Sequence, residues 1–245
     1  MSDLPLPSLI GLIAVLLLSL SWHEAAHAWV ADRLGDPTAR SLGRVTLNPI
    51  KHMDLFLSVL LPAALILAGF TPFGGGKPVP IDQRNFKHPS RDFMLVAVAG
   101  PLSNLLLSGV FSLLYLLCVW RGAFVTSIDN PYGPATPYLP SILDEASTDP
   151  WRFMLQMGLL VNITLALFNL LPIPPLDGSR IVGWLLPRPL KPFWYRIDRF
   201  AFLMVIGLLL LLHSDASRPI FQFIQSAWLE AGDVVDNLAW KLTPA

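Results

Sequence analysis

The chain is organised around the stretch Trp22-His23-Glu24-Ala25-Ala26-His27-Ala28, which contains an H-E-x-x-H motif. On a helix, His23 and His27 lie four residues apart, so both imidazoles project from one face. Two such nitrogens can bind one Zn²⁺, and Glu24 beside them can accept a proton from water at the metal. The motif therefore predicts a zinc centre at which water is activated.

The residues before this motif place it in a membrane. Leu4 to Trp22 is a run of 19 residues without a charge, about the length of helix needed to cross a bilayer. The motif therefore lies at the C-terminal end of a predicted membrane helix. A glutamate and two histidines are costly there unless they have a function. A zinc site is favoured over the alternative, a chance match in which both histidines face lipid headgroups.

The composition is that of an integral membrane protein. The chain has 245 residues, of which 53% are hydrophobic and 14% charged, whereas soluble domains carry about 25% charged residues. The net charge is zero, so nothing indicates nucleic acid as a partner. The single Cys118 excludes a disulfide framework and a cysteine-based metal site. The first apolar run has no lysine or arginine before it, which favours a retained span over a secretory signal peptide.

Five apolar stretches predict an all-α polytopic membrane protein with about five to six transmembrane or re-entrant segments. They comprise residues 4–30, 55–70, 93–120, 153–176 and 200–212. The second is only 16 residues long and runs into Thr71-Pro72-Phe73-Gly74-Gly75-Gly76-Lys77-Pro78-Val79-Pro80, which cannot be helical. We expect residues 1–214 to form one membrane-embedded domain. Residues 215–245 would be either an amphipathic helix on the membrane surface or a loosely packed tail.

The lysine and arginine residues predict the orientation in the membrane. Of the 17 basic residues, 13 lie in residues 31–54, 77–92 and 177–199, which we place in the cytoplasm. The motif then lies near the cytoplasmic side of the cell membrane. Residues 31–54 and 77–92 share that side only if residues 55–76 enter the membrane and return. They would either cross fully and come back as a short extended segment, or dip in without crossing.

A third zinc ligand is expected downstream, because a catalytic zinc usually has three protein ligands and one open position. The candidate is Asp177, in Asn169-Leu170-Leu171-Pro172-Ile173-Pro174-Pro175-Leu176-Asp177-Gly178. The prolines end the helix, and Gly178 permits a tight turn beside the carboxylate. An Asp-Gly pair after prolines is by itself usually only a turn. Here its predicted depth and side of the membrane match those of the motif.

Several of these motifs resemble those of the site-2 protease family of intramembrane zinc metalloproteases (peptidase family M50). The resemblance is carried by His23-Glu24-Ala25-Ala26-His27 and Leu176-Asp177-Gly178. Leu47-Asn48-Pro49-Ile50-Lys51-His52 and Ala99-Gly100-Pro101-Leu102-Ser103-Asn104 also resemble its minimal bacterial branch, which has no PDZ or CBS domain. The resemblance implies one zinc ion per chain. It also implies hydrolysis of peptide bonds in or near the transmembrane segment of single-span membrane proteins.

The resemblance implies roles for the motif residues. His23, His27 and Asp177 would bind the zinc, and Glu24 would act as general base and then pass its proton to the leaving amine. A tetrahedral intermediate needs a hydrogen-bond donor for its oxyanion. The candidate is Asn169, eight residues before Asp177. Its alternative role is a hydrogen bond between helices.

Other residues are candidates for contacts around this site. Candidates for substrate binding are Gly74, Gly75, Gly76, Pro78, Val79 and Asn104. An extended segment at residues 74–80 could pair with an unwound substrate as an added strand; the alternative is a plain surface loop. Asn104 follows Gly100-Pro101, which also favours a packing role. His52 is a candidate for a supporting or gating contact near the metal, or for a histidine at the membrane interface.

Two other classes of function remain open at this point. The chain could be a non-enzymatic zinc-binding membrane protein such as a transporter, although a base beside the two histidines is superfluous there. It could also be an inactive adaptor that binds single-span proteins, against which the intact Glu24 argues. The expected partners are single-span substrates and the lipid bilayer. The oligomeric state stays open.

Overall fold

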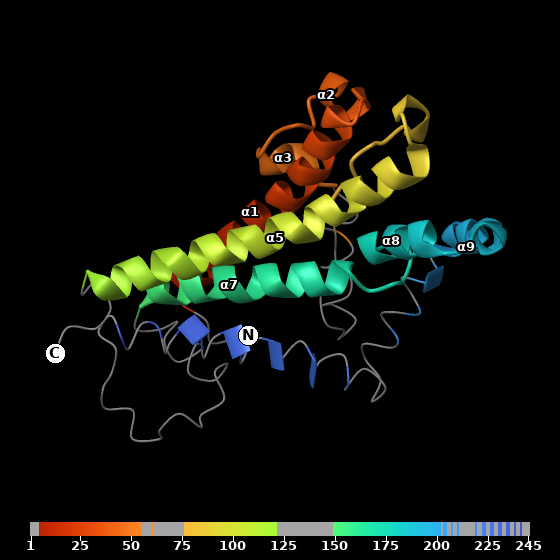
Figure 1. Cartoon of the computed structure of the whole chain (residues 1–245). Coiled ribbons are helices and arrows are strands. Elements are labelled where there is room, and N and C mark those ends of the chain that lie inside the picture. The colour runs from red at the N-terminus through yellow and green to blue at the C-terminus, as the bar shows by residue number, and fades with distance from the viewer. Residues whose placement is uncertain are drawn as a thin grey trace. The chain divides into compact units, whose positions relative to one another are not determined.

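The computed structural model describes residues 5–54, 60, 76–121 and 149–201, together with scattered residues between 203 and 241. Within these residues it contains helices and no strand (Figure 1). The long helices are α1 (Leu6–Arg33), α5 (Pro89–Trp120) and α7 (Pro150–Asn169). The short helices are α2 (Thr38–Ser41), α3 (Pro49–His52), α8 (Asp177–Leu185) and α9 (Lys191–Ile197). Single 3₁₀ turns form η2 (Gln83–Asn85), η4 (Arg188–Leu190) and η5 (Asp198–Phe200).

Helices α1, α5 and α7 are each long and apolar enough to cross a membrane. Many of their leucines and isoleucines are exposed, which suits side chains that face lipid. The prediction of an all-helical membrane protein is thereby confirmed for the described part of the chain. Of the five to six predicted segments, three are confirmed. Residues 55–70 except residue 60, and most of 200–212, lie outside the described residues, as do Gly74 and Gly75.

The ends of the long helices follow from local chemistry. Helix α5 begins at Pro89, four residues before the apolar stretch 93–120, because proline is well suited to the first helical turn. The carboxylate of Asp92 accepts a hydrogen bond from the backbone N–H of His88 at 2.9 Å, which stabilises the start of this helix. Helix α7 begins after Asp149, whose Oδ1 accepts two backbone N–H groups at 3.1 Å. It ends at Asn169, before Pro172, because of the prolines that follow, as the sequence predicts.

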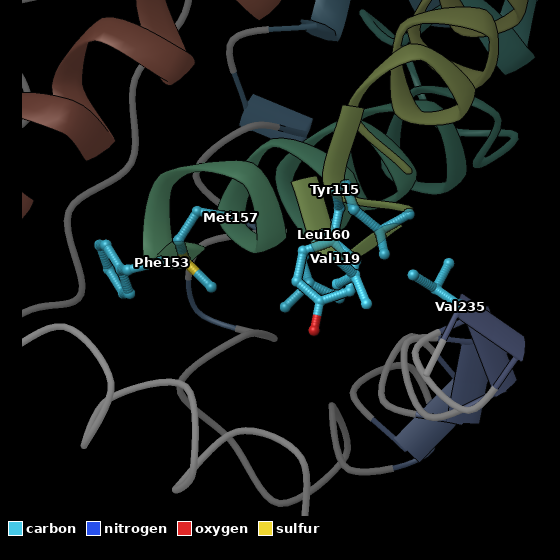
Figure 2. Packing of buried hydrophobic residues seen from close by; sticks show 7 residues of the cluster. Tyr115, Val119, Phe153, Met157, Leu160 and Val235 are labelled. Atoms are coloured by element: carbon cyan, nitrogen blue, oxygen red, sulfur yellow. The ribbon is translucent and has the colours of Figure 1, made fainter. Parts of the chain in front are cut away.

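The chain divides into two compact units, and the first comprises residues 1–19, 105–164 and 221–245. Its core joins α5 to α7, which lie side by side there (Figure 2). The buried residues are Tyr115, Val119, Phe153, Met157, Leu159, Leu160 and Val235. Val235 belongs to the predicted C-terminal tail, in which the described residues between 219 and 241 are helical. Whether the rest of this tail lies on the membrane surface stays a prediction.

The second unit comprises residues 20–104 and 165–220, and it contains every candidate metal ligand. Ala31, Phe86 and Val96 form a small core between the end of α1, the turn before α5 and the first part of α5. This core brings the motif end of α1 against α5. It therefore fixes which face of α5 the two histidines can meet.

A buried carboxylate connects two loops of the second unit. Asp36, which is fully buried, accepts hydrogen bonds from Thr38, from the side chain of Asn85 and from the backbone N–H of Asp82. Burial by itself would raise the pKa of Asp36, but these hydrogen bonds outweigh it and lower the pKa below its usual value of 3.8. The ionised carboxylate therefore stabilises the junction between the loop after α1 and residues 82–85.

Candidate metal centre

Helix α1 places the two histidines of the motif on one buried face. His23 and His27 are 5% and 7% exposed, and their Nε2 atoms lie 3.0 Å apart. Their rings are nearly perpendicular, with centroids 4.6 Å apart. The spacing of four residues thus directs two nitrogen atoms at one point, as the sequence predicts.

The carboxylate of Asp177 reaches the same point from a distant part of the chain. After α7 ends, residues 170–176 turn back, and Asp177 is the first residue of α8. Its Oδ2 lies 3.1 Å from Nε2 of His23 and 3.3 Å from Nε2 of His27. These three residues form a group that could hold a metal ion.

The turn that delivers Asp177 depends on a glycine and a tryptophan. A Cβ on Gly178 would lie 2.2 Å from the backbone oxygen of Leu170, so only glycine allows α8 to start this close to the end of α7. One turn into α8, the backbone oxygen of Ser179 accepts the indole N–H of Trp194 on α9 at 2.8 Å. Both contacts hold the first turn of α8, and with it the carboxylate, in place.

The second nitrogen of each imidazole is hydrogen-bonded to α5. Nδ1 of His27 donates to the backbone oxygen of Val96 at 2.7 Å, and Nδ1 of His23 donates to Oδ1 of Asn104 at 2.5 Å. In a neutral imidazole whose Nδ1 carries the proton, Nε2 has only a lone pair. The 3.0 Å approach of the two Nε2 atoms is therefore a meeting of two acceptors, not a hydrogen bond between them.

With both imidazoles neutral, three acceptor atoms thus converge with no proton between them. Among the described residues, Oδ2 of Asp177 is buried and has no hydrogen-bond donor. Such an arrangement is repulsive unless a cation lies among the three atoms. Around a tetrahedral zinc, ligand atoms about 2.0–2.2 Å from the metal lie about 3.3–3.6 Å from one another. The distances of 3.0, 3.1 and 3.3 Å are close to this range, so the residues present fit a zinc ion with three protein ligands.

Helix α5 also approaches both rings at a residue without a side chain. A Cβ on Gly100 would lie 2.4 Å from Nε2 of His27 and 2.6 Å from Cε1 of His23. Real Cβ atoms essentially never come this close to other atoms. The imidazoles can occupy their positions only because residue 100 is glycine.

The structure describes both candidate catalytic residues. Glu24 is half-buried on α1, next to His23. Asn169 is half-buried at the last position of α7, and its Nδ2 donates one hydrogen bond to the backbone oxygen of Leu165 at 2.8 Å. An amide nitrogen has two protons, and this hydrogen bond uses one of them. The predicted role of Asn169 toward the oxyanion stays a prediction.

The remaining predicted residues lie at different places in the second unit. Asn104 is fully buried and contacts His23, so its amide has no exposed surface to offer a substrate. His52 is also buried, and its Nε2 lies 2.7 Å from the backbone oxygen of Thr46. No contact between His52 and the three candidate ligands is found among the described residues. Its predicted supporting or gating role stays a prediction.

Residues 76–82 are described without helix or strand, which fits both the predicted extended segment and a plain surface loop. The N–H of Lys77 donates to the backbone oxygen of His52 at 2.7 Å, and the oxygen of Lys77 accepts from Arg44 at 2.5 Å. Gly76 packs against Leu20, three residues before the first histidine of the motif. In the described part of the chain, Val79 between its two prolines makes no backbone hydrogen bond.

Two contributions to the site were not anticipated from the sequence: the carbonyl of Val96 and the absent side chain of Gly100. A backbone carbonyl is present at every position, so no residue type marks Val96. The signal that could have found both is the spacing of four residues from Val96 to Gly100 to Asn104, which puts them on one face of α5.

Comparison with known proteins identifies the family. The sequence matches peptidase family M50 over residues 11–212. It is 36% identical to "Putative zinc metalloprotease YwhC" of Bacillus subtilis (strain 168), over 93% of this chain and 90% of that protein. It is 32% identical to "Putative zinc metalloprotease Rip2" of Mycolicibacterium smegmatis, over 68% of this chain and 53% of that protein. No solved structure matches the chain. With its converging histidines and aspartate and its membrane-length helices, the chain therefore belongs to peptidase family M50 and is a zinc metalloprotease.

Proposed function

We propose that this protein is an intramembrane protease that cleaves single-span membrane proteins in or near their transmembrane segments. The observation that carries the proposal is the position of the metal centre. His23 and His27 lie on α1 a short distance before its end at Arg33, and this helix is long and apolar enough to cross a membrane. A metal centre on a membrane helix can reach the peptide bonds of substrate chains that are themselves in the membrane.

His23, His27 and Asp177 would hold the zinc. The bound metal would supply Lewis acidity, polarising the scissile carbonyl and lowering the pKa of a water molecule. Glu24 would take the proton of the attacking water and deliver it to the leaving amine. Asn169 would donate its free amide proton to the oxyanion that forms at the scissile carbonyl.

The extended segment at residues 76–82 is the proposed substrate-binding element. A helical substrate has its backbone groups paired internally and must unwind before its carbonyl can reach a metal. Within the described part of the chain, the backbone N–H and C=O of Val79 are unpaired, and the prolines on either side of it have no N–H. The hydrogen bonds of the Lys77 backbone with His52 and Arg44, and the contact of Gly76 with Leu20, hold the segment beside α1. Unwound substrate could pair with it by strand addition.

The basic residues of this unit support a cytoplasmic location for the site. Arg33 is the last residue of α1, and three more basic residues follow it: Arg40, Arg44 and Lys51. Arg180, Arg188 and Lys191 follow Asp177. Cytoplasmic loops of membrane proteins carry such an excess. The centre would therefore release the cytoplasmic portion of its substrates at the inner face of the cell membrane.

The test is cleavage of tagged single-span proteins in proteoliposomes that contain wild-type protein or the Glu24→Gln variant. The matched control is Glu230→Gln, a change of the same kind at an exposed glutamate near the C-terminus. We expect wild type and Glu230→Gln to cut the substrate and Glu24→Gln not to cut it. Mass spectrometry of the products should place the cut in or beside the apolar segment.

Two results would contradict the proposal. Cleavage confined to soluble loops of the substrate would show a protease that does not work within the membrane. Equal products from wild type and Glu24→Gln would show that this centre performs no proteolysis, which would favour zinc transport or an adaptor role.

A further inference from the structure

Helix α5 presents three consecutive turns to the two histidines. Val96, Gly100 and Asn104 are spaced by four residues, so they form one row along the helix. The row meets the pair of histidines on α1, which has the same spacing. At one end the Val96 carbonyl accepts from His27, at the other Asn104 accepts from His23, and Gly100 lies against both rings.

From this row we infer that Asn104 is a positioning residue for the metal ligand His23, and that it acts by selecting the tautomer of the imidazole. The inference rests on the proposed zinc site. It gives Asn104 a role in metal binding rather than in substrate binding or helix packing.

The physical argument concerns which nitrogen of His23 carries the proton. A neutral imidazole has one N–H and one lone pair, and only the nitrogen with the lone pair can bind a metal. The 2.5 Å hydrogen bond to Oδ1 of Asn104 places the proton on Nδ1 and leaves Nε2 free. Metal-bound histidines generally donate their other N–H to such an acceptor, which also fixes the plane of the ring.

Without this acceptor, the buried Nδ1–H of His23 would lose its partner. His23 is 5% exposed and Asn104 is fully buried, so water does not readily replace the amide. An unsatisfied buried donor costs about 1–3 kcal/mol. The imidazole would then gain by moving its proton to Nε2, where Oδ2 of Asp177 lies 3.1 Å away. That tautomer blocks the lone pair that the metal needs.

His27 does not depend on a side chain in this way. Its acceptor is a backbone oxygen, which no substitution removes. The two ligands are therefore unequal: the orientation of His27 is set by the fold, whereas that of His23 is set by one side chain. Of the two, only His23 loses its hydrogen-bond acceptor when one side chain is replaced.

The experiment measures zinc affinity of the purified full-length protein by competition with a chelator, without any substrate. Asn104→Leu removes the acceptor at nearly constant side-chain size, and Asn104→Asp keeps an acceptor at the same place. The matched control is Asn162→Leu. Asn162 is also fully buried, and it donates to Ser19 and to the oxygen of Gly158 rather than to a histidine.

We expect Asn104→Leu to weaken zinc binding about 10- to 100-fold. Asn104→Asp and Asn162→Leu should bind zinc like the wild type, because both keep an acceptor for His23. If Asn104→Leu is not recovered as folded protein, Asn104→Ala removes the same acceptor without adding bulk. It should give the same loss.

Three outcomes would overturn the inference. Unchanged zinc affinity in both Asn104→Leu and Asn104→Ala would show that the acceptor does not matter. Equal losses in Asn104→Leu and Asn162→Leu would show a packing role, as would a loss in Asn104→Asp. A His23→Ala variant separates this failure from that of the zinc site. If His23→Ala binds zinc like the wild type, the assignment of the zinc site is wrong. If His23→Ala loses zinc while Asn104→Leu keeps it, only the role of Asn104 is refuted.

Discussion

Substituting alanine for Gly100 should strongly weaken zinc binding while the protein stays folded. The new methyl carbon would lie 2.4 Å from Nε2 of His27, whereas ordinary contact begins at 3.4 Å. The ring must therefore retreat by about 1 Å, yet metal–ligand distances tolerate only about 0.2 Å. We expect zinc affinity to fall by at least about 100-fold, more than for loss of a supporting hydrogen bond.

The same helix offers a matched control at Gly109, where an added Cβ meets nothing within 4 Å. Alanine is the better helix former in a helix interior, by about 0.5–1 kcal/mol, but residue 100 precedes Pro101, whose ring also meets an added Cβ at position 100. The difference in zinc binding between the two variants therefore reports the clash with the histidines once both apo proteins are shown to be equally folded. Gly109→Ala should keep wild-type zinc and unfold at the same or a slightly higher temperature.

The assay is zinc content by mass spectrometry, followed by chelator competition and thermal unfolding in detergent. Thermal unfolding of both apo proteins checks that Gly100→Ala is folded. If Gly100→Ala binds zinc within about threefold of Gly109→Ala, α5 does not confine the two imidazoles. The account of the metal centre would then be wrong at its best-defined contact.

Three further predictions concern the reaction, the fold and the membrane topology. Asn169→Ala should slow cleavage by about 10²–10³-fold with zinc content unchanged, the usual effect of losing an oxyanion donor; a variant that loses zinc instead would assign Asn169 to the metal site. Asp36→Asn should lower the free energy of unfolding by roughly 2 kcal/mol at pH 7. The folded-state pKa of Asp36 is lowered from 3.8, so its contribution to the free energy of unfolding is full above pH 3.8 and is lost as the pH falls through the lower folded-state pKa. The difference in melting temperature between wild type and Asp36→Asn should therefore vanish in strong acid and persist at pH 6. In a Cys118→Ser background, single cysteines replacing Ser41, Ser90 and Ser141 should differ in labelling from outside intact cells: only the one at 141 should react, and labelling at 90 without 41 would show one simple crossing by residues 55–76.

Much of the candidate site could be predicted from local patterns in the sequence. The spacing of His23 and His27 indicates a shared face whatever the rest of the chain does. Asp177 is 150 residues away, but the prolines before it and its predicted side of the membrane favoured the same location, and the structure brings the three side chains together.

What the sequence could not show depends on contacts between helices. Which face of α5 meets the histidines is decided by the small core around Val96 and Phe86, whose members are ordinary apolar residues. Asn104 and Gly100 therefore looked like packing residues, and the Val96 carbonyl has no signature at all. The bounds of the apolar stretches also differ from those of the helices, because Pro89 and Pro172 decide where the chain can be helical.

The central claim is that three side chains hold one zinc ion while Glu24 serves only as a base. The direct measurement is the zinc content of purified Asp177→Ala and Glu24→Gln beside wild type. We expect about one zinc per chain in wild type and Glu24→Gln and little in Asp177→Ala, because loss of one of three ligands leaves too few. Full zinc occupancy in Asp177→Ala, or its loss in Glu24→Gln, would contradict this assignment of roles.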